Sequence, residues 1–394
     1  MNDIAYYETS LDYKDFLEKH LIPNQPALFG PKLTQDWKAR KEWVVPHHDS
    51  SPQFKPNYNY LRDHFGDARV QVAQCHIRHF TDQERREMDF KEFCQLWEAD
   101  QGKESEYYLK DWHFVKAFPD EEAYQVPDIF KDDWLNAYWI HNSEDDYRFS
   151  YMGGHGTFTP LHADVYRSYS WSSNICGIKK WTLFPPGQEE CFKDKFGNLV
   201  YDIRHVDPVQ FPRFQEAKRS VVYQKDGETL FVPSGWFHQV ENIGATISIN
   251  HNWSNSTNAY LTFKSLLNDF EEVKKSIEDL KECMTPDEFM KECQQLLLMH
   301  SGWNWSIFLH ILHYIASEYI TDCDHQPSVH WQMERVGEIL ADWVSNEGEE
   351  LLNYLANKRD VFRKIIYDWV NHTNHEIGFL LLYWVASFVL ILFS

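Results

Sequence analysis

The pattern of hydrophobic and polar positions divides the chain into three regions. Residues 1–130 mix stretches of helical spacing with short strand-like ones such as Val70-Gln71-Val72. Between residues 131 and 256, short apolar runs separated by turn-forming residues predict a core of β-strands. Across residues 257–376, apolar side chains recur every three or four positions, which predicts helices. We therefore expect a mainly β fold with α elements: an N-terminal α/β elaboration, a β core and a C-terminal helical region.

One polar stretch interrupts the predicted β core, from Lys193 to Lys218. It contains the turn-forming pairs Gly197-Asn198 and Asp207-Pro208. Two interpretations remain open, a lid over a substrate and a simple connecting loop. We favour the loop, because most insertions only connect the elements on either side of them.

The last segment, residues 377–394, is apolar and carries no charged side chain. Its 18 residues lie at the lower limit for a helix that spans a membrane. Four basic residues lie upstream, on what would be the cytosolic side of a tail anchor: Lys358, Arg359, Arg363 and Lys364. A tail anchor is therefore one interpretation. The other is a buried final helix or strand that packs on the helical region or on a second copy of the chain.

Composition and charge narrow the class of protein. Hydrophobic residues make up 43% of the 394 positions, which is enough for a large core in a soluble globular protein. The formal net charge of −22 disfavours a nucleic-acid partner and is compatible with a basic protein substrate. The seven cysteines are scattered without a Cys-x-x-Cys pair, so we expect a reducing compartment and no structural zinc module. The N-terminus lacks the pattern of a signal peptide. We expect a cytoplasmic protein, with the nucleus as a second location, and the pattern does not indicate an oligomeric state.

Two separated segments supply side chains that can hold a metal ion. His162-Ala163-Asp164 offers an imidazole and a carboxylate, and positions i and i+2 of an extended strand point to the same face. The strand-like run from Leu230 to His238 ends on a histidine that is distant enough to come from another strand. Two imidazoles and one carboxylate leave three coordination positions open. This arrangement is typical of non-haem Fe(II).

A His-x-Asp pair alone is a weak signal in a chain with 20 histidines, but its surroundings strengthen it. Thr159 stands three positions before His162, and the strand-like run Cys176 to Phe184 begins with the pair Lys179-Lys180. A lysine inside a sheet is costly unless an anion meets it, and a dicarboxylate co-substrate is such an anion. Because adjacent strand residues face opposite sides, we expect Lys180 at the surface.

Four ordered motifs resemble those of the JmjC-domain 2-oxoglutarate oxygenases of the cupin superfamily. They are Thr-x-x-His-x-Asp, Gly-x-Lys-Lys-Trp, Phe-Pro-Pro and Pro-x-x-Trp-x-His, within residues 108–253, and a looser likeness covers residues 16–29. Residues 162–172 and 185–190 are similar to those of the JmjC lysyl hydroxylases that modify a eukaryotic translation termination factor. The resemblance implies a double-stranded β-helix, the cupin jelly roll, for residues 131–256.

The resemblance also implies a metal site and a co-substrate pocket. By the resemblance, Fe(II) is held by His162, Asp164 and His238. The far carboxylate of 2-oxoglutarate is held by Lys179, Thr159 and Tyr108, and Asn252 lines the pocket. Lysine would supply a point charge and the two hydroxyl groups would donate hydrogen bonds. O₂ is the remaining co-substrate. The chain departs from several relatives at Ser172, where they have an asparagine, and this puts one pocket contact in doubt.

Three classes of function remain in play. The resemblance favours a protein hydroxylase that acts on a lysine of a translation termination factor and produces succinate and CO₂. A JmjC N-methyl-lysine demethylase would use the same iron site, although chromatin-acting relatives usually carry zinc-binding modules and this chain has no clusters of cysteine pairs. A JmjC-like binding protein without catalysis is disfavoured, because the metal ligands and the lysine anchor are all present in the sequence.

Overall fold

The computed structural model describes residues 4–47, 53–100, 103–321 and 323–346. Contacts between these residues divide the chain into two compact units. The first, here called the β unit, comprises Met1–Lys131, Glu144–Asp164 and Ser168–Trp253. The second, here called the helical unit, comprises Asp132–Ser143, Val165–Arg167 and the described residues from Ser254 to Asn346. The predicted region boundaries at residues 130, 256 and 376 remain predictions, and the apolar segment 377–394 lies outside the described residues.

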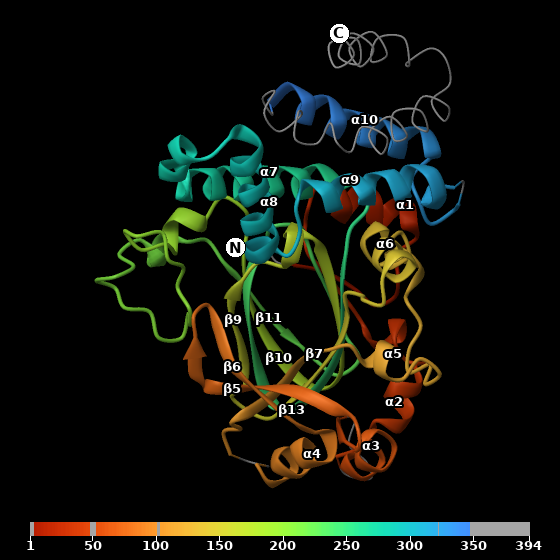
Figure 1. Ribbon diagram of the computed structural model, residues 1–394. Helices are drawn as coiled ribbons and strands as arrows, with labels where there is room; N and C mark the ends of the chain where they lie inside the picture. Colours follow the sequence, from red (N-terminus) through yellow and green to blue (C-terminus); the bar gives the residue numbers. More distant parts are fainter. Residues whose placement is uncertain (1–3, 48–52, 101–102, 322, 347–394) are drawn as a thin grey trace. The chain divides into compact units, whose positions relative to one another are not determined.

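Eleven strands of the described chain form one sheet in the β unit (Figure 1). These strands are β1 (Ala5–Tyr7), β2 (Ala27–Phe29), β5 (Arg69–His79), β6 (Asp82–Asp89), β7 (Tyr107–Trp112), β8 (Arg148–Gly153), β9 (Phe158–His162), β10 (Tyr169–Phe184), β11 (Ser220–Gln224), β12 (Thr229–Val232) and β13 (Phe237–Trp253). A separate two-stranded sheet pairs β3 (Val44–Pro46) with β4 (Phe54–Pro56). The insertion between Lys193 and Lys218 adds no strand to either sheet, and the choice between a lid and a connecting loop stays a prediction.

Two long strands, β10 and β13, organise the jelly roll. They pair antiparallel from Tyr169–Trp253 at one end to Phe184–Phe237 at the other. Each strand changes its second partner halfway: β10 pairs first with β12 and then with β11, whereas β13 pairs first with β9 and then with β8. Register shifts on either side of Cys176 mark the change in β10. The two halves therefore belong to two faces of one double-stranded β-helix, which confirms the cupin fold expected from the sequence.

The N-terminal region shares a hydrophobic core with the jelly roll. Phe16, from the short helix α1 (Tyr13–Phe16), packs edge-on against Phe231 of β12 with ring centroids 5.1 Å apart. Phe130 stacks on Trp171 of β10 with centroids 5.6 Å apart. Because these side chains are almost completely buried, the N-terminal residues are an integral part of the jelly-roll core. The remaining helices of this unit are α2 (Lys38–Glu42), α3 (Tyr58–Phe65), α4 (Phe90–Ala99) and α5 (Phe114–Ala117).

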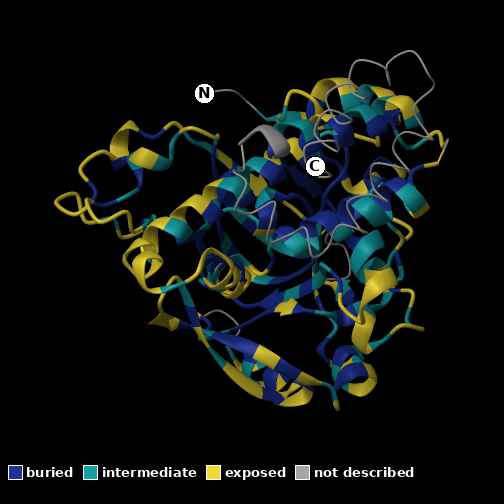
Figure 2. Cartoon of the chain, turned by 45° about the horizontal axis from the view of Figure 1, so that its top comes forward, coloured by how far each residue is buried: buried dark blue, intermediate teal, exposed yellow. Residues whose placement is uncertain are grey.

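The helical unit consists of α6 (Trp134–Asn142), α7 (Ala259–Ser276), α8 (Pro286–Ser301), α9 (Trp305–Tyr314) and α10 (Val329–Asn346). Helix α8 begins with a capping box, in which Thr285 and Glu288 satisfy each other's backbone N–H groups. Buried residues follow the paired strands and the inner faces of the helices, and exposed residues gather on the outer turns and loops (Figure 2). Within the described residues, no helix is long and apolar enough to span a membrane.

Candidate metal centre

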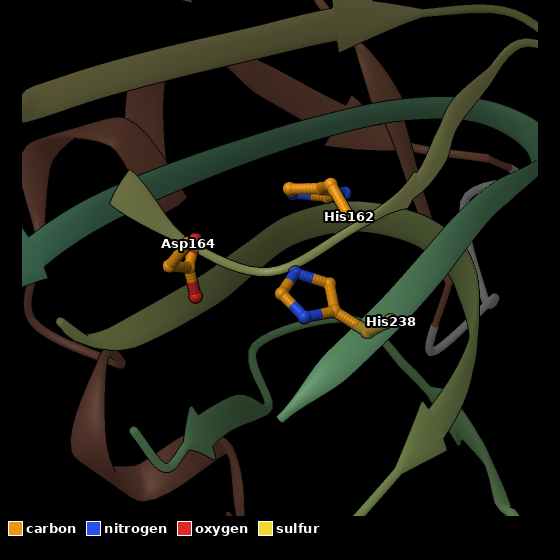
Figure 3. Close-up of side chains that lie close together, drawn as sticks. All are labelled: His162, Asp164 and His238. Atoms are coloured by element: carbon orange, nitrogen blue, oxygen red, sulfur yellow. The ribbon is translucent and has the colours of Figure 1, made fainter. Parts of the chain in front are cut away.

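The structure brings His162, Asp164 and His238 together, as the sequence predicts (Figure 3). His162 ends β9 and lies opposite His238 on β13, with ring centroids 4.3 Å apart. One ligand atom from each of the three residues lies within 4.8 Å of the other two. Because the two imidazoles and the carboxylate converge from one side, they match the donor set of a non-haem Fe(II) site and leave coordination positions open.

The local geometry of this cluster differs from the uninterrupted strands that the sequence predicts. Strand β9 stops at His162, so Asp164 lies in the turn that follows it. The single strand expected from Leu230 to His238 is also wrong: β12 ends at Val232 and β13 begins at Phe237. The intervening turn contains Pro233, which lacks a backbone N–H, and Gly235 with φ of +71°. His238 therefore lies at the start of its strand.

A bulge in β9 explains the three-residue spacing between Thr159 and His162. His238 pairs with His162, whereas Val240, two positions on, pairs with Thr159, three positions back. One extra residue on β9 is therefore accommodated between these pairs. Without it, an odd spacing would place the two side chains on opposite faces of the strand. The bulge therefore puts Thr159 and His162 on the same face of β9.

Backbone carbonyl groups determine that Nδ1 of each of the two histidines carries a hydrogen. The Nδ1 atom of His162 lies 2.8 Å from the carbonyl oxygen of Pro160, and that of His238 lies 3.0 Å from the carbonyl oxygen of Trp236. A carbonyl oxygen only accepts, so each Nδ1 carries a hydrogen, and in the neutral ring the lone pair that can bind a metal is then on Nε2. Burial, together with the neighbouring His238, lowers the pKa of His162 to about 4, which keeps its ring neutral.

The carboxylate ligand has a partner that the sequence did not indicate. The hydroxyl of Ser170 on β10 donates a hydrogen bond of 2.7 Å to Oδ2 of Asp164. Such a bond orients a ligating carboxylate and leaves its other oxygen for the metal. Serine is too common for a sequence pattern to select this residue. Only the pairing of β10 with its neighbours shows that Ser170 lies beside Asp164.

Lys179 forms the centre of an anion pocket. Its side chain is 1% exposed, and its ammonium donates a 3.1 Å hydrogen bond to the hydroxyl of Tyr108. Burial raises the pKa of this hydroxyl, and the nearby side chains of Asn242 and Thr159 act against that rise. In the described part of the chain, no carboxylate forms an ion pair with Lys179. Burial alone lowers its pKa to about 7. A buried cation with hydroxyl neighbours and no anion fits the far carboxylate of a dicarboxylate ligand.

The bulge at Gly177 sets the direction of Lys179. Gly177 has φ of +79°, and the side-chain amide of Asn174 donates a 2.7 Å hydrogen bond to its carbonyl oxygen. An added Cβ would collide with the backbone of Ala245, so only glycine fits. The adjacent Lys180 points to the other side and pairs with Glu241 at 3.0 Å, as strand alternation predicts.

Two asparagines that the sequence likeness includes, Asn252 and Asn24, lie on or next to the strands of the site. Asn252 lies on β13, and its amide donates to the hydroxyl of Ser168 at 3.2 Å, so its place in the pocket remains a prediction. Asn24, within the looser N-terminal likeness, accepts a hydrogen bond from the backbone N–H of Ser234 and donates one to its carbonyl, both at 2.9 Å. The indole of Trp236 also donates to the carbonyl of Asn24. Asn24 thus holds the turn that precedes His238.

Comparisons with known proteins agree with this architecture. A family profile described as "Cupin-like domain" matches residues 13–259. The "2-oxoglutarate and iron-dependent oxygenase JMJD4" of Danio rerio is 41% identical over 333 residues, which cover 82% of this chain and 77% of that protein. The human protein of the same name is 39% identical over 318 residues, or 78% and 74% of the two chains. The "Arginine-specific demethylase JMJ20" of Arabidopsis thaliana is 46% identical over 316 residues, which cover 76% of this chain and 66% of the relative.

The fold, the donor set and these relatives define the class of protein as a cupin-fold oxygenase that depends on iron and 2-oxoglutarate. Within that class, the chain belongs to the JMJD4 family of JmjC oxygenases. The two imidazoles and the carboxylate fit iron, and the buried ammonium of Lys179, which forms no ion pair within the described residues, fits 2-oxoglutarate. The chain therefore carries suitable donors for both of the groups on which the family depends.

Proposed function

We propose that the protein hydroxylates a lysine side chain within a polypeptide, and that this polypeptide is a translation termination factor. The observation that carries the proposal is the joint presence of the three metal ligands and the buried Lys179 in a chain whose residues 162–172 are similar to those of the termination-factor lysyl hydroxylases. The net charge of −22 supports a lysine-bearing protein partner rather than a nucleic acid, because complementary charge speeds association. We expect this encounter in the cytoplasm.

We assign the roles within the site as follows. His162, Asp164 and His238 hold Fe(II), and Ser170 keeps the Asp164 carboxylate in position. Lys179, Tyr108 and Thr159 bind the far carboxylate of 2-oxoglutarate. When bound, iron and 2-oxoglutarate supply the oxidising chemistry, with O₂ consumed and succinate and CO₂ released. The protein's own residues bind and orient these groups.

The test is incubation of the purified protein with Fe(II), 2-oxoglutarate and the intact termination factor, followed by peptide mapping. The expected product is a lysine residue that has gained one oxygen atom. Asp164→Ala is the inactive control, because it removes the anionic metal ligand. Succinate formation by this variant at full iron occupancy would show that the metal site is misplaced. An unmodified factor beside an active enzyme would contradict the proposed substrate.

A second candidate function is the demethylation of methylated arginine, which the name of the Arabidopsis thaliana relative favours at 46% identity. The same metal site serves both reactions, because hydroxylation of an N-methyl group leads to loss of that methyl as formaldehyde. Peptides that carry methyl-arginine or methyl-lysine distinguish the candidates. Release of formaldehyde with loss of a methyl group supports demethylation, whereas a stable gain of one oxygen on unmethylated lysine supports the hydroxylase.

A further inference from the structure

Asp111 occupies an unusual backbone position next to the co-substrate pocket. It lies on β7 with φ of +58°, a left-handed conformation that is uncommon for residues other than glycine. The pairing of β7 with β8 is interrupted here: Leu109 pairs with Met152, and Trp112, three positions on, pairs with Ser150, only two positions back. The bulge that results turns the Asp111 side chain away from regular alternation. Backbone strain of this kind often accompanies a functional constraint.

The Asp111 carboxylate binds two side chains from other strands of the sheet, one on the adjacent β8 and one on β6, beyond β5. Its Oδ1 accepts a 2.5 Å hydrogen bond from the hydroxyl of Tyr151 on β8. Its Oδ2 accepts a 2.6 Å hydrogen bond from the guanidinium of Arg85 on β6. Burial acts to raise the pKa of Asp111, but Arg85, Lys110 and the Tyr151 hydroxyl together outweigh it and the pKa is lowered. Burial and Asp111 raise the pKa of Tyr151 well above its usual value, so Tyr151 is the donor.

The ring of Tyr151 lies against the ammonium of Lys179. The distance from Nζ to the Tyr151 ring centroid is 5.6 Å, and the distance to the Tyr108 ring centroid is 5.7 Å. Two aromatic rings thus flank one buried ammonium, within the range of cation–π attraction. Lysine has three donor hydrogens, and the hydroxyl of Tyr108 takes one of them. The other two are needed by an incoming carboxylate.

We propose that Asp111 is a positioning residue for the co-substrate pocket: by accepting the Tyr151 hydroxyl, it fixes the Tyr151 ring beside Lys179 and prevents that hydroxyl from competing for the ammonium. Arg85 holds the carboxylate from its other side. The inference rests on the proposed placement of the 2-oxoglutarate carboxylate at Lys179. Asp111, at the β-bulge of β7, acts through Tyr151 and does not itself touch the ligand.

The test measures the Kd of 2-oxoglutarate for the full chain loaded with Mn(II), without O₂, by calorimetry. Asp111→Asn and Tyr151→Phe remove the same charge-assisted bond from its two ends. Each is expected to raise the Kd about tenfold. The double variant should raise it no further than either single change, because the bond is lost only once. In turnover, KM for 2-oxoglutarate should rise while kcat at saturation stays near that of the unaltered protein.

Asp82→Asn is the matched control. Asp82 also binds Arg85, at 2.9 Å, and its side chain is 44% exposed, as is that of Asp111. It also pairs with Lys110 at 2.6 Å. No contact between Asp82 and Tyr151 occurs among the described residues, so the Kd should stay within about twofold. An equal rise in Asp82→Asn would overturn the proposal, because the effect would then arise from Arg85 or the sheet in general.

Two further results would also overturn it: an unchanged Kd in Tyr151→Phe, or additive effects in the double variant. Tyr151→Phe keeps the aromatic ring and removes only the hydroxyl, so it tests the proposal even if Asp111→Asn does not fold. Lys179→Ala separates this inference from the proposed function. If Lys179→Ala binds 2-oxoglutarate as tightly as the unaltered protein, the co-substrate placement itself is wrong. If Lys179→Ala binds 2-oxoglutarate weakly but the Asp111 and Tyr151 variants bind it normally, the co-substrate placement at Lys179 is supported and the positioning role of Asp111 is wrong.

Discussion

Lys179 illustrates how one buried charge prepares the site for an anion. Its ammonium has lost nearly all contact with water, and its only hydrogen-bond partner in the described chain is the Tyr108 hydroxyl. A charge in such surroundings is destabilised until a carboxylate meets it. The pKa of about 7 expresses this cost, since desolvation favours the neutral amine. The same cost makes the pocket selective for anionic ligands.

The first prediction is a pH dependence of 2-oxoglutarate binding. The carboxylate binds the ammonium form, and this form is depleted as the pH rises through the empty-pocket pKa of about 7. Affinity should therefore fall by about tenfold per pH unit above that value, and binding at about pH 8 should take up a proton. Calorimetry in two buffers of different ionisation enthalpy measures this uptake. Lys179→Gln is the control, whose weaker binding should not vary with pH between about 6 and 9. The same flat profile in the unaltered protein would contradict the prediction.

The second prediction compares the two adjacent lysines. Lys179→Ala should raise KM for 2-oxoglutarate by roughly tenfold to a hundredfold, the equivalent of about 1.5–3 kcal/mol for a lost charge-assisted bond. Lys180→Ala removes only the partly exposed pair with Glu241, and KM should change by less than about twofold. Steady-state kinetics with both variants gives the comparison. The reverse order of effects would mean that the strand register places the wrong lysine in the pocket.

At the scale of the element, β-bulges direct polar side chains to positions that regular strands could not reach. The bulges in β7, β9 and β10 fall near Asp111, between Thr159 and His162, and around Gly177. Each one reorients a polar side chain that strand alternation would direct elsewhere. Two of these bulges can thus be recognised in the sequence, from the Gly-x-Lys and Thr-x-x-His motifs. The bulge near Asp111 has no recognisable motif.

The third prediction concerns the bulge at Gly177. Gly177→Ala combines a positive φ with a collision against the Ala245 backbone, so it should destabilise the fold by about 2–4 kcal/mol and weaken 2-oxoglutarate binding. Gly187→Ala is the matched control. Gly187 also has a positive φ, of +85°, but nothing lies within 4 Å of an added Cβ. Its cost should be only about 1–2 kcal/mol, with no loss of binding. Denaturant unfolding and ligand titration measure both effects, and equal losses in the two variants would argue against a specific role for the bulge.

The same elements show what could be predicted from the sequence. His162, Asp164, His238 and Lys179 were predictable because metal-ligating and buried charged residues are scarce in sheets and occur here in ordered motifs. Ser170 and Asp111 were not, because common residues acquire their roles only when strands pair across long stretches of chain. The separation of β12 from β13 was also missed, although the turn-forming run Pro233-Ser234-Gly235 interrupts the apolar pattern and could have indicated it.

At the scale of the whole molecule, the N-terminal region belongs to the catalytic unit. Its aromatic side chains lie in one hydrophobic cluster with those of the jelly roll, and contacts place it in the same compact unit. Asn24 links the two ends of this unit. Its side-chain amide makes two hydrogen bonds to the backbone of Ser234, 210 positions later in the chain. Because Ser234 lies in the turn before His238, this link supports a metal ligand from the N-terminal side.

The last prediction tests that long-range link. Asn24→Ala removes both bonds to Ser234 and places alanine at φ of +55°, which asparagine tolerates better. The expected loss is about 2–3 kcal/mol in the free energy of unfolding, together with weaker retention of Fe(II) as the turn before His238 loosens. Gln25→Ala is the control, because its side-chain bond to the Pro23 carbonyl is exposed; it should change stability by less than about 0.5 kcal/mol. Denaturant titration and competition with a chelator provide the two measurements. Normal iron retention in Asn24→Ala, despite a clear loss of stability, would limit the role of Asn24 to folding and leave His238 to be held by its own strand.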